Sequence, residues 1–221
     1  MNNNRNTHGR KGIMQSKWFA IVELSTSIIV LAVAIFMLIG REPSYKEVQK
    51  TYSSMVEDLT IRNTDINRYN VFGQRAAQEG NIALERLYAA GANGQRSVLE
   101  KEYNMMNKIM ERSMPNGSSI EAKDGEEGLM LVIDNEKHKE ATIYPRYKKS
   151  AEEEKFNKGI DLFDKSKRAS DANRQLFEKV AEEKDFKKDI KAFACYECGC
   201  IYKDEAPTKC QICGADKNNI K

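Results

Sequence analysis

Apolar and polar residues alternate along most of the chain with the spacing of amphipathic helices. The capping box of Ser44 and Glu47 predicts the start of a helix, and apolar residues then recur every three or four positions as far as Tyr69. The helix is expected to stop at Glu79-Gly80-Asn81. One position of this stripe is charged, Arg62. The apolar members are Tyr45, Val48, Tyr52, Met55, Leu59, Ile66 and Tyr69. The pattern predicts one long helix that buries a single face.

The same pattern predicts three further helices. The second runs from about Ile82 to Met114, and a Gly- and Ser-rich loop follows it to about Gly128. Pro145 is expected to kink the third helix. The apolar positions of the third and fourth helices are Leu129, Val132, Ile143 and Tyr147, then Phe156, Ile160, Phe163, Phe177 and Val180. The chain is therefore predicted to be mainly α, with a four-helix bundle over residues 41–185.

Residues 18–40 form one long apolar run, WFAIVELSTSIIVLAVAIFMLIG. As a helix it is long enough to cross about 30 Å of hydrocarbon, so it predicts a single-pass transmembrane helix after a polar basic tail, residues 1–17. A cleaved signal peptide is the alternative, but the run is too long and no small-residue cleavage site follows it. Glu23 lies inside the run and either contacts another membrane subunit or snorkels to the interface.

All five cysteines lie near the C-terminal end, in the predicted linker and metal module of residues 186–221. Two CxxCG loops supply four thiolates, which predict a tetrahedral metal site. Soft thiolates select iron or zinc over magnesium or calcium, and the clustering argues against a disulfide framework. The expected ligands are Cys195, Cys198, Cys210 and Cys213. The fifth cysteine, Cys200, is expected to pack as a small apolar residue.

Composition and charge narrow the classes of function. The 221 residues carry 36 basic and 33 acidic side chains, interleaved to a net charge of +3, and no basic patch with interleaved aromatic residues is visible. This balance argues against a nucleic-acid partner. The sequence also shows no phosphate-binding glycine loop, nucleophile–base pair or nucleotide fingerprint, so these enzyme classes are not predicted.

Over about residues 44–221 the chain resembles the rubrerythrins. The motifs that carry the resemblance are Asn67-Arg68-Tyr69 followed by Glu79-Gly80, Ile143-Tyr144-Pro145 followed by residues 151–156, and the two CxxCG loops. The resemblance implies a ferritin-like di-iron bundle followed by a small rubredoxin-like iron domain. The resemblance also implies the family's activity, which is peroxide reduction at the di-iron centre with electrons supplied by the rubredoxin-like iron.

The ligand positions that the resemblance implies for the di-iron site mostly hold other residues. Such a site needs inward carboxylates and ExxH pairs, but His8 and His138 are the only histidines and neither belongs to an ExxH motif. The corresponding positions are Arg62, then Gly94 and Ser97 (or Gln95 and Val98 in the neighbouring register), then Glu136 and Lys139, then Ser170 and Asn173. Only Glu136 matches a ligand, so no di-iron centre is expected.

Arg62 and Lys139 fall on the inward stripes of their helices, where the metal ions would lie. We expect Glu136 to pair with Arg62 or Lys139, because an unpaired charge in a bundle core costs several kcal/mol. The alternative is that Lys139 extends outward to solvent.

The sequence therefore predicts a membrane-anchored rubrerythrin-like protein that carries one electron through a four-cysteine iron centre. It would serve as an accessory or electron-transfer subunit of a membrane redox complex, or act with a redox partner protein, and have no catalytic activity of its own. The alternative is a structural scaffold subunit with zinc at the cysteines; a peroxidase is disfavoured by the missing ExxH pairs. The side of the membrane is open, because flanking basic residues favour the outside and thiolates favour the cytoplasm.

Overall fold

The computed structural model describes residues 28–33 and 41–221. Residues 28–33 are helical, whereas the predicted tail, Glu23 and the rest of the predicted transmembrane helix lie outside the described residues. Among the described helices, none combines the length and apolar character needed to cross a bilayer. This finding contradicts the predicted single-pass membrane localisation, which is corrected accordingly.

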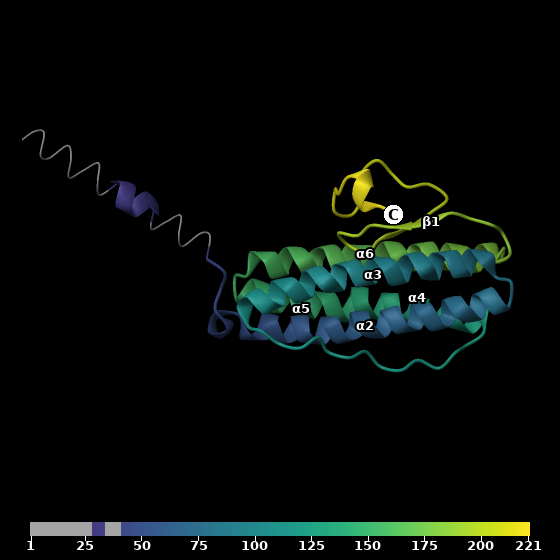
Figure 1. Cartoon of the computed structure of the whole chain (residues 1–221), viewed down its shortest axis with the longest axis horizontal. Helices are drawn as coiled ribbons and strands as arrows, with labels where there is room; N and C mark the ends of the chain where they lie inside the picture. The colour runs from purple at the N-terminus through teal and green to yellow at the C-terminus, as the bar shows by residue number, and fades with distance from the viewer. Residues whose placement is uncertain (1–27, 34–40) are drawn as a thin grey trace, which may run out of the picture. The chain divides into compact units, whose positions relative to one another are not determined.

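Residues 43–221 form one compact unit in which long helices lie side by side (Figure 1). A short 3-10 helix, η1, precedes them, and a π-helical segment, η2, joins α4 to α5. The elements are η1 Tyr45–Glu47, α2 Gln49–Gln78, α3 Ile82–Ile109, α4 Gly125–His138, η2 Lys139–Ile143, α5 Tyr144–Glu153 and α6 Asn157–Glu183. With α4, η2 and α5 counted as one interrupted helix, these elements confirm the predicted four-helix bundle.

The N-terminus of α2 is held by a contact that local sequence does not reveal. Ser44 N donates to the Glu47 carboxylate at 2.7 Å, so the predicted capping box forms, but it starts η1. The first turn of α2 is capped from across the bundle: the backbone N–H groups of Lys50 and Thr51 each donate to the Glu154 carboxylate at 2.8 Å. These donors have no partner within the helix, so the carboxylate stabilises its start.

The third bundle helix is interrupted directly before Pro145, where the sequence predicts a kink. Proline has no N–H to donate to the carbonyl four residues earlier, and the five residues before α5 widen into the π-helical segment η2. Lys139, the first residue of η2, is buried. The second helix also ends earlier than predicted, at Ile109, because Met110 adopts an extended conformation.

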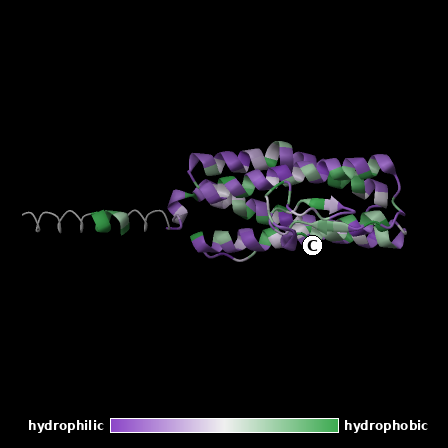
Figure 2. Ribbon diagram, turned by 90° about the horizontal axis from the view of Figure 1, so that it is seen from above, coloured by the Kyte–Doolittle hydropathy of each residue, from purple (hydrophilic) through white to green (hydrophobic). Residues whose placement is uncertain are grey.

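The bundle core is formed by the predicted stripes. Tyr52, Met55 and Leu59 are fully or almost fully buried, whereas Tyr45 at the edge of the stripe is exposed. Figure 2 shows hydrophilic and hydrophobic residues alternating along each helix, as amphipathic packing requires. The connection between α3 and α4 lies along α2, where Asn63 Nδ2 donates to the Pro115 carbonyl at 2.6 Å.

After α6 the chain folds back over the bundle as a small module containing two short antiparallel strands. Strand β1, Ala192–Ala194, pairs with β2, Ile201–Lys203, and a 3-10 helix, η3, spans Lys217–Asn219. The module lies against α3 and α6 (Figure 1). At Gly94 of α3 an added Cβ would lie only 3.0 Å from Ala194 Cβ, so glycine permits this close approach. The predicted division between bundle and module at residues 185 and 186 stays a prediction.

Candidate metal centre and buried charge network

The module brings the four predicted cysteine ligands together. Their Sγ atoms all lie within 4.8 Å of one another, and the structure contains no disulfide among them. Cys195 Sγ lies 3.5 Å from Cys213 Sγ, and Cys198 Sγ lies 3.6 Å from Cys210 Sγ. A tetrahedral ion with metal–sulfur bonds of about 2.3 Å requires sulfur–sulfur distances of about 3.8 Å. The residues therefore fit a thiolate-bound metal ion.

The two CxxCG loops have the same backbone construction. Gly199 and Gly214 adopt φ values of +79° and +75°, which favour glycine. Gly199 N donates to the Cys195 carbonyl at 2.8 Å, and Gly214 N donates to the Cys210 carbonyl at 2.9 Å. Each loop thereby turns its two thiols toward the same point, as the spacing predicts.

The surroundings of the Cys195 thiol favour its charged form, whereas the surroundings of Cys200 favour its neutral form. The Cys198 thiol, with the backbone N–H groups of Glu197 and Cys198, lowers the pKa of Cys195 to about 5. Burial raises the pKa of Cys200 to about 12. Cys200 is buried and stands outside the four-sulfur cluster, as expected for a small apolar residue. The Tyr202 hydroxyl donates to Cys210 Sγ at 3.1 Å.

Asn173 connects the bundle to this metal module. Its amide nitrogen Nδ2 donates to the Gly199 carbonyl at 3.1 Å, and its Oδ1 accepts from Ile201 N at 2.8 Å. Ser97 Oγ donates to the Tyr196 carbonyl at 2.9 Å. Two positions at which the resemblance implies metal ligands therefore hold the cysteine loops in place. The sequence shows only that Asn173 and Ser97 are poor ligands, because their partners come from a distant part of the chain.

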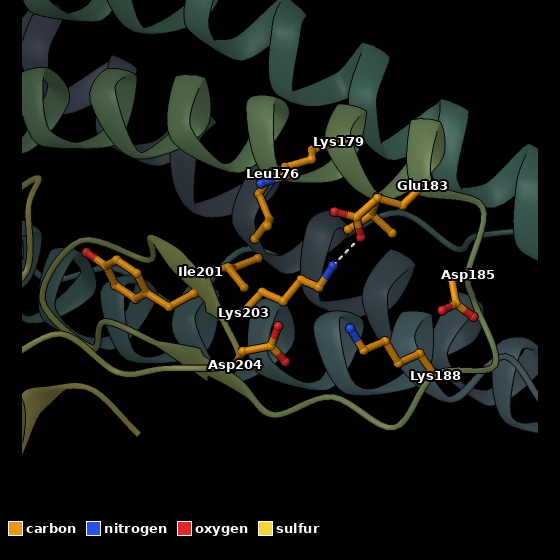
Figure 3. Close-up of a pocket in the computed structure, with 10 residues that line it drawn as sticks. Leu176, Lys179, Glu183, Asp185, Lys188, Ile201, Lys203 and Asp204 are labelled. Carbon is orange, nitrogen blue, oxygen red and sulfur yellow. Dashed lines mark hydrogen bonds and ion pairs between the residues drawn. The ribbon is translucent and has the colours of Figure 1, made fainter.

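A charged cleft marks the junction between α6 and the module (Figure 3). It has a volume of about 620 Å³, with Leu176 and Ile201 among its apolar residues. Lys203 of β2 points toward Glu183 at the end of α6 and forms an ion pair with it. Tyr202, which contacts a cysteine ligand, also lines the cleft. Ion pairing therefore adds to the contacts between bundle and module.

Inside the bundle, Arg62 points inward and is only 1% exposed, as its place on the stripe predicts. Its Nε donates to Glu102 Oε2 at 2.9 Å and to Asp58 Oδ2 at 3.0 Å. Its Nη1 donates to Gln95 Oε1 at 2.8 Å, and its Nη2 donates to Ser166 Oγ at 2.7 Å. The carboxylates that compensate this guanidinium therefore come from α2 and α3, and Glu136 is not among them.

Lys139 forms a second buried ion cluster. Its Nζ lies 2.6 Å from Asp65 Oδ2 and 2.7 Å from Glu136 Oε1, and Tyr69 OH donates to the same Glu136 oxygen at 3.0 Å. Burial lowers the pKa of Lys139, but Asp65 and Glu136 outweigh it and hold the pKa above its ordinary value. The predicted Glu136–Lys139 pair is present, and Lys139 does not extend to solvent.

The remaining implied ligand positions serve packing. Of the two registers considered for the second helix, Gln95 contacts Arg62 while Gly94 and Ser97 face the module. Val98 and Ser170 are buried. The three acidic side chains that complete the clusters were not predicted from the sequence: Asp58, Asp65 and Glu102. Glu102 could have been found, because it continues the buried stripe of Val98, Leu99 and Met106.

The fold and the site define a class: a ferritin-like bundle with a C-terminal four-cysteine, rubredoxin-like module. No family model matches the chain. It is similar to Rubrerythrin-1 of Clostridium acetobutylicum, with 23% identity over 175 residues that cover 74% of this chain and 89% of the relative. Rubrerythrin of Clostridium perfringens is 26% identical over 179 residues, with the same coverage.

Nigerythrin of Nitratidesulfovibrio vulgaris is 24% identical over 154 residues, which cover 69% of this chain and 76% of nigerythrin. A solved structure of nigerythrin in a partially reduced state superposes with a TM-score of 0.73 at 21% identity, over 82% of this chain and 87% of that chain. These comparisons confirm the resemblance to the rubrerythrin family that the sequence motifs indicate.

Proposed function

We propose that the protein carries single electrons through one iron ion held by Cys195, Cys198, Cys210 and Cys213. In this proposal it exchanges electrons with a redox partner protein, as an electron-transfer or accessory component, and its bundle holds no di-iron centre. The observation that carries the proposal is the convergence of four sulfur atoms to within 4.8 Å in a module packed on the bundle. Four-thiolate iron supplies a one-electron ferric–ferrous couple.

The choice of iron rests on relatives of similar fold. A solved nigerythrin structure is described as fully reduced and all ferrous, so that protein holds iron. The residues of this chain would tune such a centre: the Tyr202 hydroxyl donates to Cys210 Sγ, and burial of three ligands limits contact with water. Cys213 is the partly exposed ligand, so in this proposal electrons enter the centre beside it. Zinc in the same thiolates is the alternative, and would make the module structural.

The proposal that the bundle lacks a di-iron centre rests on charge. The Arg62 guanidinium and Lys139 ammonium, each 1% exposed, already contact Asp58, Glu102, Asp65 and Glu136. Two like unit charges 4 Å apart repel by about 4 kcal/mol at an effective dielectric constant of 20, and a divalent ion doubles this. A metal ion would therefore compete with buried cations for every one of these carboxylates.

Purified protein from iron-replete cells provides the test. We expect one iron per chain and a ferric–thiolate absorption spectrum that is bleached reversibly by one electron. Colourless protein with one zinc would support the structural scaffold instead. Iron without a ferric–thiolate spectrum, or three irons per chain, would contradict the proposal. The Cys200→Ser variant is the matched control, because Cys200 lies beside the cluster without belonging to it.

A further inference from the structure

The two buried ion clusters differ in their balance of charge. The Lys139 cluster contains two carboxylates, Asp65 and Glu136, and Asp65 also pairs with Arg68, so two cations face two anions. In the Arg62 cluster a single guanidinium faces the two carboxyl groups of Asp58 and Glu102. If both were ionised, this cluster would hold a negative charge in excess with no exposed member. Buried charge without a partner is strongly unfavourable.

The hydrogen bonds of the Arg62 cluster also leave one oxygen of each carboxyl group without a partner. Arg62 donates to Asp58 Oδ2 and Glu102 Oε2. The other oxygens, Asp58 Oδ1 and Glu102 Oε1, are buried and have no hydrogen-bond partner in the part of the chain that the structure describes. The two carboxyl groups are neighbours, because both accept a hydrogen bond from the same Arg62 Nε, at 3.0 Å and 2.9 Å. As carboxylates both can only accept, whereas one proton between them supplies the missing donor.

We propose that Asp58 and Glu102 share one proton, and that this carboxyl pair is a proton-binding site in the core of the bundle. The shared proton removes the excess charge and supplies the donor that a pair of buried carboxylates lacks, so one assignment accounts for both features. Burial, and then the neighbouring Asp58, raise the pKa of Glu102 well above its usual range although Arg62 acts in the opposite direction. This proton site lies within the bundle, and its existence does not depend on which metal the cysteines hold.

The groups that face the pair from other elements are neutral or already compensated. Ser166 of α6 and Gln95 of α3 accept hydrogen bonds from Arg62 and carry no charge. Burial raises the pKa of Tyr144 and Tyr147 of α5, which keeps both phenols neutral. Asp65, Glu136 and Lys139 form the balanced second cluster. Of the cations in the cleft beside Glu102, Lys101 pairs with Glu197 and Lys165 pairs with Asp161. None of them supplies the cation that a second ionised carboxylate beside Arg62 would need.

A cleft gives the site a route for exchanging its proton with solvent. It has a volume of about 260 Å³ between α3, α6 and the metal module, and Glu102 lines it together with Val98, Leu162 and Cys198. Lys101, Lys158 and Lys165 also line it. The pair is therefore expected to reach protonation equilibrium without unfolding of the bundle.

Binding of this proton makes stability depend on pH in a defined direction. The folded pKa of Glu102 lies above the unfolded value, so the stabilisation is complete below the unfolded pKa and is lost as pH rises through the folded pKa. Across that interval the native chain holds one proton more than the unfolded chain. The unfolding constant should therefore rise about tenfold per pH unit through this group alone.

Infrared spectroscopy of the full chain tests the shared proton directly. At neutral pH we expect a carbonyl band of a protonated carboxyl group that shifts in deuterated water. Glu102→Gln supplies an amide N–H in place of the carboxyl proton, so the band should disappear while the fold is kept. Asp58→Asn should also remove it. Glu136→Gln is the matched control from the balanced cluster and should leave the band unchanged.

The unfolding constants provide the second readout. The ratio of the wild-type constant to that of Glu102→Gln should rise about tenfold per pH unit above about pH 5, until the folded pKa is reached. Should a variant fail to fold, the wild-type spectrum alone decides. Absence of a protonated-carboxyl band in the wild type between pH 6 and 8 would overturn the proposal, as would a ratio that is independent of pH.

Discussion

The cysteine module and the bundle core both contain positions at which the resemblance to the rubrerythrins implies metal ligands, but their chemistry differs. In the module, four sulfur atoms lie within 4.8 Å of one another, and the side chain that donates to Cys210 Sγ is the neutral Tyr202 hydroxyl. In the core, four buried carboxyl groups converge on Arg62 and Lys139. Acidic residues alone therefore do not indicate a metal site, because the same carboxylates can compensate side-chain cations. The decisive difference is whether the ligand atoms are free of an internal cation.

Two positions at which the resemblance implies metal ligands have different roles in this chain. Arg62 contacts Asp58 and Glu102 in the bundle core, whereas Asn173 contacts the metal module. The resemblance implies metal ligands at both positions. One therefore compensates charge within the bundle, and the other attaches the remaining metal site to it.

The largest effect is expected from loss of one thiolate. Cys198→Ser should abolish stoichiometric metal binding and disorder the module, because structural thiolate metals supply about 10 kcal/mol or more of folding free energy. The α-helical circular dichroism of the bundle should change little. Metal analysis and near-ultraviolet dichroism provide the measurements, and metal binding as tight as in the wild type would contradict the assigned ligand set.

The second-largest effect on stability is expected from removal of the Arg62 guanidinium. Arg62→Met leaves the Asp58–Glu102 pair without its cation, and breaking a buried pair in this way costs about 3–5 kcal/mol of unfolding free energy. The loss should shrink as pH falls, because the pair then takes up a second proton and no longer carries a charge that needs the guanidinium. Denaturant unfolding across pH provides the measurement.

The control for Arg62→Met is Arg146→Ala, which removes an exposed ion pair with Glu57 and should cost less than about 1 kcal/mol. Equal losses of unfolding free energy in the two variants would show that the buried ion pairs of Arg62 contribute no more than an exposed pair.

A smaller effect is expected where the bundle holds the module. Asn173→Ala leaves the Gly199 carbonyl and the Ile201 amide without their partner, which costs about 1–3 kcal/mol in a buried setting. Hydrogen exchange of the Ile201 amide should accelerate. Asn93→Ala on the exposed face of α3 serves as the control, and unchanged exchange at Ile201 would remove Asn173 from this role.

The smallest effect concerns the electronic properties of the centre. Tyr202→Phe removes the hydroxyl that donates to Cys210 Sγ. This hydrogen bond stabilises the more negative reduced state, so its loss should lower the reduction potential by roughly 40 mV, the equivalent of about 1 kcal/mol for one electron. Spectroelectrochemical titration measures it. Tyr103→Phe, far from the cysteines in sequence and bonded to the Arg112 carbonyl, should leave the potential unchanged.

Much of this architecture could be predicted from local pattern. Periodicity located the bundle helices, and cysteine spacing identified the four-sulfur cluster. The inward direction of Arg62 followed from its place between Leu59 and Ile66. Each of these features depends on residues that are close in sequence.

The features that were missed depend on residues far apart in the chain. Arg62 and Glu102 are 40 positions apart, Asn173 and Gly199 are 26 apart, and Thr51 is capped by Glu154 from 103 positions away. No local pattern indicates such partners. Hydropathy over residues 18–40 predicted a membrane localisation that the described helices contradict.

Diffraction at the iron absorption edge, on crystals of iron-replete protein, tests the central claim most directly. The account predicts one anomalous peak, located between the four Sγ atoms of the cysteine module. A peak in the bundle core beside Arg62 or Lys139 would contradict it.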